Sequence, residues 1–109
     1  MRILIHPRTI TADRDLRTRV AEALETALGR LDQCLRRVDV YLTDVNGPRG
    51  GPDKRCRIVA HLAAGSPVVV SRTDRDPVAA AAAAAIRCRR SVRSYLKMRQ
   101  GRRVRSVVG

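Results

Sequence analysis

The sequence of 109 residues is long enough for one domain with a single core and too short for a separate catalytic domain. It contains 23 Lys and Arg against 10 Asp and Glu, a formal charge of +13, so the chain should attract polyanions or acidic membrane surfaces. With two tyrosines and no Phe or Trp, it lacks the aromatic platforms on which single-strand readers stack bases.

The N-terminal third predicts a strand followed by a long helix. Residues 2–6 are mostly apolar and are closed by Pro7, as in a first strand. From residue 13 to about residue 35, apolar side chains recur at the spacing of an amphipathic helix, and Thr11 or Asp13 can cap its start. The other side of this helix carries mixed charges, which is typical of a solvated surface.

Three strands are predicted in the middle of the chain. Residues 38–43 alternate strictly between apolar and polar, so one side of this strand should face the core. Residues 55–62 alternate in the same way, and after a tight turn at 64–67 a fourth strand starts at Val68.

The segment 46–53, between the second and third predicted strands, is dense in Gly and Pro and cannot continue a strand. It is similar to a phosphate-binding loop only in its glycines, because the GxxxxGK[ST] motif is missing. We therefore expect a hairpin connection, with an RNA contact through Arg49 or Lys54 as the alternative.

A second helix is predicted to start at the pair Asp76-Pro77, where Asp can cap and Pro at the first helical position loses no needed hydrogen bond. The alanine run that follows has the highest helix propensity, and the helix should continue to about Arg99. Helical spacing assigns to its buried side Cys88, Val92 and Tyr95 or Leu96. The same spacing assigns to its solvent side Arg87, Arg90, Arg93 and Lys97. We expect residues 101–109 to form a flexible basic tail, outside a domain of residues 1–100.

The positive charge is concentrated in the C-terminal third of the chain, which contains this helix and the tail. After Asp76 no acidic residue occurs, while the remaining residues hold nine Lys and Arg. A surface that only keeps a protein soluble mixes positive and negative side chains. A segment without acidic residues therefore favours phosphate binding over a merely solvated surface. A helix lying on a membrane is the disfavoured alternative, because its apolar side is mostly alanine. The longest apolar run, 78–86, is about half a membrane span, so no transmembrane segment is expected.

The element order predicts an α+β fold, a two-layer β-α-β-β-β-α sandwich in which a four-stranded mixed sheet carries both helices on one face. The first helix forms a crossover, so the first two strands should be parallel and the remaining strands antiparallel neighbours. The opposite face of the sheet should then carry Asp39, Tyr41, Arg55, Arg57 and His61.

Residues that could carry chemistry are few and scattered. Cys34, Cys56 and Cys88 form neither a CxxC pair nor a Cys/His quartet, so we expect buried free thiols, no metal site and a reducing cytoplasm without a secretory leader. His6 and His61 have no nucleophile near them in sequence, and no GxSxG, P-loop or HExxH motif occurs. We therefore expect no enzyme activity, no cofactor and no small-molecule substrate.

Several short motifs occur in a specific order and spacing over residues 1–97. They are Ile10-Thr11, Leu16-Arg17, Arg30-Leu31-Asp32-Gln33, Arg37-Val38, Ala60-His61-Leu62 and Asp76-Pro77-Val78-Ala79-Ala80. Together they resemble the ribosome hibernation-promoting factor family, small ribosome-associated translation inhibitors. The resemblance implies a fold similar to double-stranded RNA-binding domains. It also implies binding between the head and body of the small ribosomal subunit, where the family obstructs messenger and transfer RNA sites in stressed or stationary cells.

The resemblance also indicates which residues contact RNA. Arg87 and Arg90 match basic positions on the family's second helix, and Arg30 matches one late in the first helix. With the neighbouring basic residues, the expected RNA-binding set is Arg87, Arg89, Arg90, Arg93, Lys97, Arg30 and Arg37.

The expected partner is ribosomal RNA of the small subunit, bound by a monomer of this chain. One alternative is a general structured-RNA-binding protein or RNA chaperone without ribosome specificity. Another is a regulatory protein whose basic helix docks an acidic protein.

Overall fold

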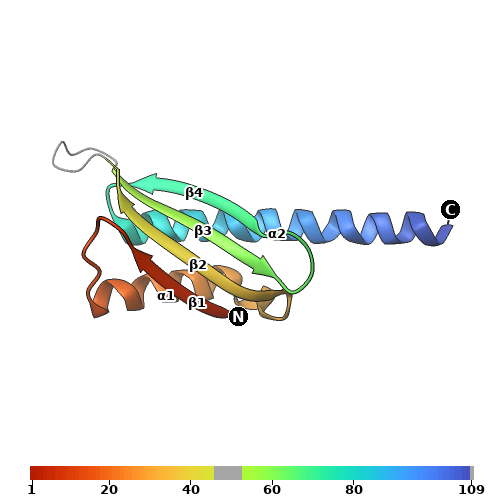
Figure 1. Cartoon of the computed structure of the whole chain (residues 1–109), viewed down its shortest axis with the longest axis horizontal. Helices are drawn as coiled ribbons and strands as arrows, with labels where there is room; N and C mark the ends of the chain where they lie inside the picture. The colour runs from red at the N-terminus through yellow and green to blue at the C-terminus, as the bar shows by residue number, and fades with distance from the viewer. Residues whose placement is uncertain (46–52, 109) are drawn as a thin grey trace.

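The computed structural model describes residues 1–45 and 53–108, with side chains up to Arg99. Its elements follow in the predicted order: β1 (Arg2–Pro7), α1 (Arg14–Leu28), the 3-10 helix η1 (Gly29–Cys34), β2 (Leu35–Asp44), β3 (Lys54–Leu62), β4 (Val68–Asp74) and α2 (Pro77–Val108). Both helices lie on one side of a four-stranded sheet (Figure 1). The predicted α+β fold class is therefore confirmed. Apart from Asp53, the predicted hairpin connection 46–53 lies outside the described residues.

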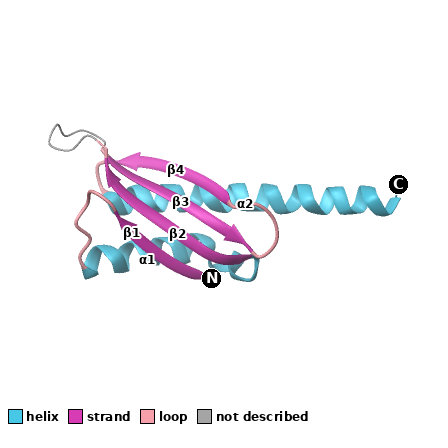
Figure 2. Ribbon diagram, viewed as in Figure 1, coloured by secondary structure: helices cyan, strands magenta, loops and turns pink. Residues whose placement is uncertain are grey.

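The strands of the sheet lie in the order β1-β2-β3-β4. β1 pairs with β2 in parallel, with Ile3 opposite Val38, as expected for strands joined by a helical crossover. β2, β3 and β4 pair as antiparallel neighbours. Successive side chains of a strand point to opposite faces, so each strand has one helix-facing set and one set on the face turned away from α1 and α2. We call the latter the open face (Figure 2).

The core lies between the sheet and the two helices and is mainly aliphatic. β2 and β3 contribute fully buried Val38, Val40, Leu42, Cys56 and Ile58. α1 contributes Val20, Leu24, Ala27 and Leu28, and α2 contributes Ala80, Ala81, Ala84, Ala85, Cys88 and Val92. Each buried Val, Leu or Ile stabilises the fold by about 1.5–3 kcal/mol before entropy is counted. The alanines of α2 are short, so this helix can pack closely on β3, β4 and α1.

The first helix is shorter than the sequence predicts. α1 ends at Leu28 and the chain continues as η1, whereas the apolar spacing predicts an α-helix to about residue 35. Leu28 at the end of α1 and Leu35 at the start of β2 are both buried, and the tighter 3-10 segment between them, which has no buried residue of its own, leads the chain directly into β2. At the other end Asp13 is the cap, with its Oδ1 accepting a hydrogen bond from the Leu16 amide at 2.8 Å.

The second helix starts as predicted and extends further than predicted. Asp76 Oδ1 accepts a hydrogen bond from the Val78 amide at 3.0 Å, and Pro77 occupies the first helical position. α2 then continues to Val108, past the expected end near Arg99, because the lone glycine at 101 costs only about 1 kcal/mol. At 1.5 Å per residue its 32 residues span about 48 Å, and Figure 1 shows it projecting well beyond the sheet. The mobility expected for residues 101–109 stays a prediction.

All three cysteines are free. Cys56 and Cys88 are fully buried, as predicted, but Cys34 is only half-buried at the end of η1, so the prediction is wrong for this residue. Within the described part of the chain, none of the helices has the length and apolar character needed to cross a bilayer.

Candidate RNA-binding surface

The solvent side of α2 carries a basic stripe, defined as Arg87, Arg90, Arg93 and Lys97. All four side chains are exposed, whereas Cys88 and Val92 between them are fully buried. The division follows from the 3.6-residue period of an α-helix. Residues three or four positions apart lie on the same side of the helix, and the residues between them point elsewhere. No acidic residue of α2 interrupts the stripe.

Two members of the stripe line a groove between α2 and the edge strand β4. Arg87 and Arg90 line it from the helix and Arg72 lines it from the strand, around a volume of about 840 Å³. Arg72 lies on the helix-facing side of β4, two residues after buried Val70. Sequence reasoning missed Arg72, although the period of two along β4 contains the signal. Three guanidinium groups around one concavity suit a phosphate backbone.

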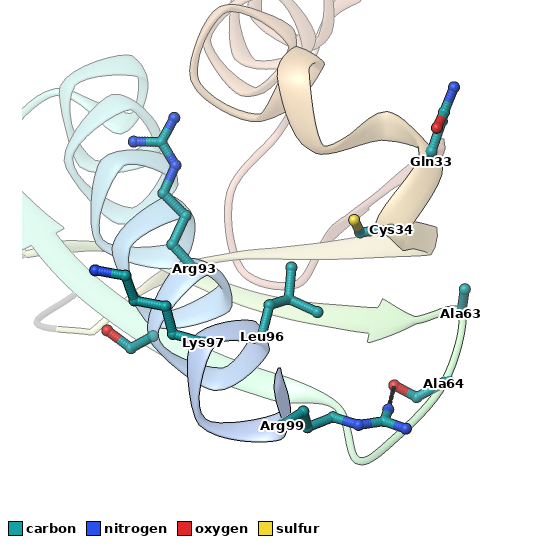
Figure 3. A pocket seen from close by; sticks show the side chains of 9 residues that line it. Gln33, Cys34, Ala63, Ala64, Arg93, Leu96, Lys97 and Arg99 are labelled. Carbon is teal, nitrogen blue, oxygen red and sulfur yellow. Dashed lines mark hydrogen bonds between the residues drawn. The ribbon is translucent and has the colours of Figure 1, made fainter. Parts of the chain in front are cut away.

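The other two members of the stripe line a pocket on the opposite flank of α2. Arg93, Leu96 and Lys97 of α2 line a hollow that Cys34 and Ala63 line from the other side. Figure 3 shows Leu96 pointing toward Cys34 across it. The pocket has a volume of about 660 Å³. The stripe is therefore a cationic ridge with a concavity on each side.

The orientation of α2 is fixed by contacts with the turn between β3 and β4. Arg99 Nη1 donates a hydrogen bond to the Ala64 carbonyl oxygen at 2.7 Å (Figure 3). About one turn earlier in the helix, the Tyr95 hydroxyl accepts a hydrogen bond from the Ser66 amide at 3.3 Å. Because these bonds join the helix to the sheet, the stripe keeps a defined direction relative to both layers.

Three other residues predicted to contact RNA lie apart from the stripe. Arg89 is half-buried on α2, and its buried Nε atom has no hydrogen-bond partner in the described part of the chain. Arg30 is exposed in η1. Arg37 lies on the open face, where its Nε donates to Asp39 Oδ2 at 3.0 Å. The structure thus groups the exposed α2 residues and places Arg37 on the opposite side of the sheet.

Lys54, the alternative RNA contact next to the loop, is held in ion pairs. Its Nζ lies 2.9 Å from Asp44 Oδ2 and 3.3 Å from Asp53 Oδ1. The hydrogen bond to Asp44, opposed by desolvation and reinforced by Asp53, raises the pKa of Lys54. Its charge is compensated in place, which disfavours a phosphate contact. Arg49, the other candidate of that loop, lies outside the described residues.

A cluster that sequence reasoning did not find lies on the open face around Asp39. The Nε2 atoms of His6 and His61 lie 2.8 and 2.9 Å from the two carboxylate oxygens, and Asp39 is only 4% exposed. Burial by itself raises the pKa of Asp39, but the hydrogen bonds from His6 and His61 and the charge of Arg37 outweigh it, so the pKa lies below 3.8. Three strands supply these groups, and only their pairing register brings them together.

The cluster is built to neutralise a buried carboxylate. His61 Nε2 also lies 3.3 Å from Arg37 Nη2, but an arginine only donates and a carboxylate only accepts, so we assign the Nε2 proton to the bond with Asp39. Among the described residues, no hydrogen bond joins His6 or His61 to a hydroxyl or thiol, as a nucleophilic relay requires. Nor does the described part of the chain hold a group of His, Cys, Asp and Glu placed to bind a metal ion.

Comparisons with known proteins agree with this architecture. A family model described as "Sigma 54 modulation protein / S30EA ribosomal protein" matches residues 3–100. The structure of the Protein Y N-terminal domain from Thermus thermophilus is 26% identical, with a TM-score of 0.65 over 87% of this chain and 99% of that one. A ribosomal subunit interface protein from Coxiella burnetii shares the fold, at 12% identity and a TM-score of 0.73, over 89% of this chain and 99% of that one. No curated protein matches the sequence.

Proposed function

Because the chain belongs to the family of sigma 54 modulation and S30EA ribosomal proteins, we propose that it is a ribosome-associated factor that binds small-subunit ribosomal RNA and inhibits translation. In this proposal the protein acts as a cytoplasmic monomer, without catalysis and without a cofactor. It occupies messenger and transfer RNA sites of ribosomes in stressed or stationary-phase cells.

The exposed stripe of α2 is the observation that carries this proposal. Arg87, Arg90, Arg93 and Lys97 present four positive charges on one side of a helix that has no acid, and Arg72 adds a fifth beside them. Each cation that neutralises a phosphate releases counterions, which makes such binding strong at low salt. Five contacts of this kind give a slope of about −4 to −5 for log K against log salt.

Sedimentation tests the proposal directly. Purified protein is mixed with ribosomes and with separated subunits at low salt and layered on sucrose gradients. We expect it to comigrate with the small subunit and with whole ribosomes, and to reduce synthesis of a reporter protein when added to a cell-free translation reaction. Recovery only at the top of every gradient would contradict the proposal.

A second candidate is a general binder of structured RNA or an RNA chaperone. It is favoured by the chemistry of the stripe, which consists of phosphate-directed cations without an aromatic side chain. The neighbouring Tyr95 is half-buried and its hydroxyl is occupied by Ser66. Equal affinity for an arbitrary RNA duplex and for the small subunit, measured in the same salt, supports this second function over the first.

A further inference from the structure

The open face of the sheet, opposite α2, carries a second concentration of arginine. Register places on it Arg2, Leu4 and His6 of β1, Arg37, Asp39, Tyr41 and Thr43 of β2, Arg55, Arg57, Val59 and His61 of β3, and Val69, Ser71 and Thr73 of β4. Two more arginines border it: Arg8 after β1 and Arg36 at the irregular start of β2. All six arginines are exposed.

The one acidic residue in this described set offsets only part of that charge, because it pairs with Arg37 alone among the six arginines. Asp39 is buried, and both of its carboxylate oxygens are occupied, Oδ1 by His6 and Oδ2 by His61 and Arg37. Its carboxylate is therefore hidden beneath the groups that a ligand would meet. A ligand approaching the open face encounters arginines, histidines and hydroxyls.

The arginines form two groups at opposite ends of the open face. At one end Arg2, Arg36 and Arg37 line a polar pocket of about 480 Å³ together with His61. Arg37 and Thr43 are six residues apart along β2, which spans about 20 Å at about 3.3 Å per residue. One group of arginines therefore lies at each end of the open face. We call the line along the strands between the two groups the track.

The far end of the track is built around Tyr41. Its ring stacks on His6 with the centroids 4.8 Å apart, and the Arg8 guanidinium carbon lies 5.2 Å from the ring centroid. On β3, Arg57 lies directly opposite Tyr41, and Arg55 lies opposite Thr43. The stack holds Tyr41 and Arg8 in place, so little side-chain entropy is lost when a ligand binds them.

The composition of this face fits a nucleic acid better than a protein. Protein partners dock on surfaces whose centres are apolar and depleted in charge. Interfaces with nucleic acids are more polar and much more positive, and arginine binds phosphate oxygens in a bidentate manner. Exposed Ser71 and Thr73 on β4 add hydroxyl donors of the kind that contact phosphates.

We propose that the open face is a second RNA-binding surface, which takes a phosphate backbone along the track from Arg2, Arg36 and Arg37 to Arg55 and Arg57. The chain then has RNA-binding surfaces on both of its layers and can hold two RNA segments on opposite sides. This inference does not depend on which RNA binds to α2.

The test uses the full-length chain with the α2 stripe weakened by Arg87→Gln, Arg90→Gln and Arg93→Gln. Into this background we introduce either Arg55→Gln with Arg57→Gln, on the open face, or Arg14→Gln with Arg19→Gln, on the exposed side of α1. Both pairs of substitutions remove two positive charges, so a loss of RNA affinity that is caused only by the lower net charge is the same for both pairs. Neither Arg55 nor Arg57 makes a hydrogen bond or ion pair among the described residues, so their replacement should leave the fold intact, which circular dichroism checks.

Binding of a fluorescent 16-base-pair RNA duplex is measured over a range of salt concentrations. We expect the open-face pair to lower the affinity at least tenfold at low salt and to reduce the salt slope by about two, since each lost phosphate contact removes about 0.9. The α1 pair should lower the affinity less than threefold. Equal losses of RNA affinity for the open-face pair and the α1 pair overturn the proposal.

The same proteins are then titrated with polyglutamate of equal charge. Weaker binding of polyglutamate than of RNA by the background variant supports an RNA surface. Tighter binding of polyglutamate, lost with the open-face pair, overturns it in favour of an acidic protein partner. Because ribosomes are absent from these experiments, their outcome is separate from the sedimentation test of the proposed function.

Discussion

The hydroxyl group of Tyr95 in α2 lies against Gly65 in the turn between β3 and β4, where it leaves no room for a Cβ atom. Gly65 has φ +108°, in the region where residues with a Cβ are strained. Tyr95 also accepts a hydrogen bond from Ser66, so the helix and the turn are fitted to each other around one glycine.

We predict that Gly65→Ala lowers the free energy of unfolding by about 1–3 kcal/mol, because it combines backbone strain with a collision against Tyr95. Chemical denaturation followed by circular dichroism measures the change. Gly29→Ala is the control: it has a helical φ of −56° and open space around the added Cβ, so it should stabilise the protein by about 0.5–1 kcal/mol. Equal effects of the two substitutions would show that the Tyr95 contact does not constrain the turn.

The buried carboxylate of Asp39 should contribute to stability in a pH-dependent manner. Its pKa is lower in the folded chain than the ordinary 3.8, so its contribution is present above about pH 4 and is lost as the pH falls through the folded-state pKa. We predict that Asp39→Asn costs about 1–3 kcal/mol at pH 7, because charge-assisted bonds from His6, His61 and Arg37 are weakened.

Denaturation of both proteins from pH 7 downward, to the lowest pH at which the wild type stays folded, tests this account of Asp39. The difference in the free energy of unfolding between wild type and Asp39→Asn should narrow below pH 3.8. Asp32→Asn serves as the control, because Asp32 forms an exposed ion pair with the N-terminus and should matter little. A difference in the free energy of unfolding that stays constant down to the lowest pH measured contradicts the stabilising role assigned to the Asp39 carboxylate.

The three thiols should differ in reactivity. Burial raises the pKa of Cys56 to about 12 and that of Cys88 to about 11, and both side chains are inaccessible. Since the thiolate is the reactive species, only half-buried Cys34 should react with a maleimide reagent in the native protein at neutral pH. Mass spectrometry should find one label in native protein, three after unfolding, and none in native Cys34→Ser. Two or three labels on the native wild type would contradict the burial described for β3 and α2.

The helix start at Asp76 offers a test of local stability. Its carboxylate accepts from the Val78 amide, so Asp76→Ala should lower the free energy of unfolding by about 1 kcal/mol. Asp76→Asn keeps an acceptor oxygen and should recover most of that loss. The two variants are compared by thermal denaturation, and an equal loss in both would indicate that the charge of Asp76, rather than the cap, supplies the stability.

The sequence predicts the parts of this molecule that depend on local spacing. The alternation in β2 and β3, the cap at Asp76 and the division of α2 into buried Cys88 and exposed Arg87 all follow from periods that are visible in the chain. The end of α1 could not be predicted, because Leu35 fits the apolar spacing of the helix although its side chain is buried as the first residue of β2.

Features that depend on long-range pairing could not be read from spacing. Asp39 alternates with buried valines and is assigned to the open face, but its burial arises only when His6 and His61 arrive from two neighbouring strands. The period of two along β4 assigns Arg72 to the helix-facing side, but its place beside Arg87 and Arg90 arises only from the packing of β4 against the helix. Both cases involve residues more than ten positions apart in the chain.

The central claim is that the α2 stripe carries ribosome binding, and charge reversal of Arg87, Arg90 and Arg93 to Glu tests it most directly. All three side chains are exposed, so the fold should be kept, and the matched control reverses the exposed Arg14, Arg19 and Arg75. In sucrose gradients at low salt, we predict that the control triple variant comigrates with small subunits like the wild type, while the stripe variant stays at the top. Comigration of the stripe variant at wild-type levels would contradict the claim.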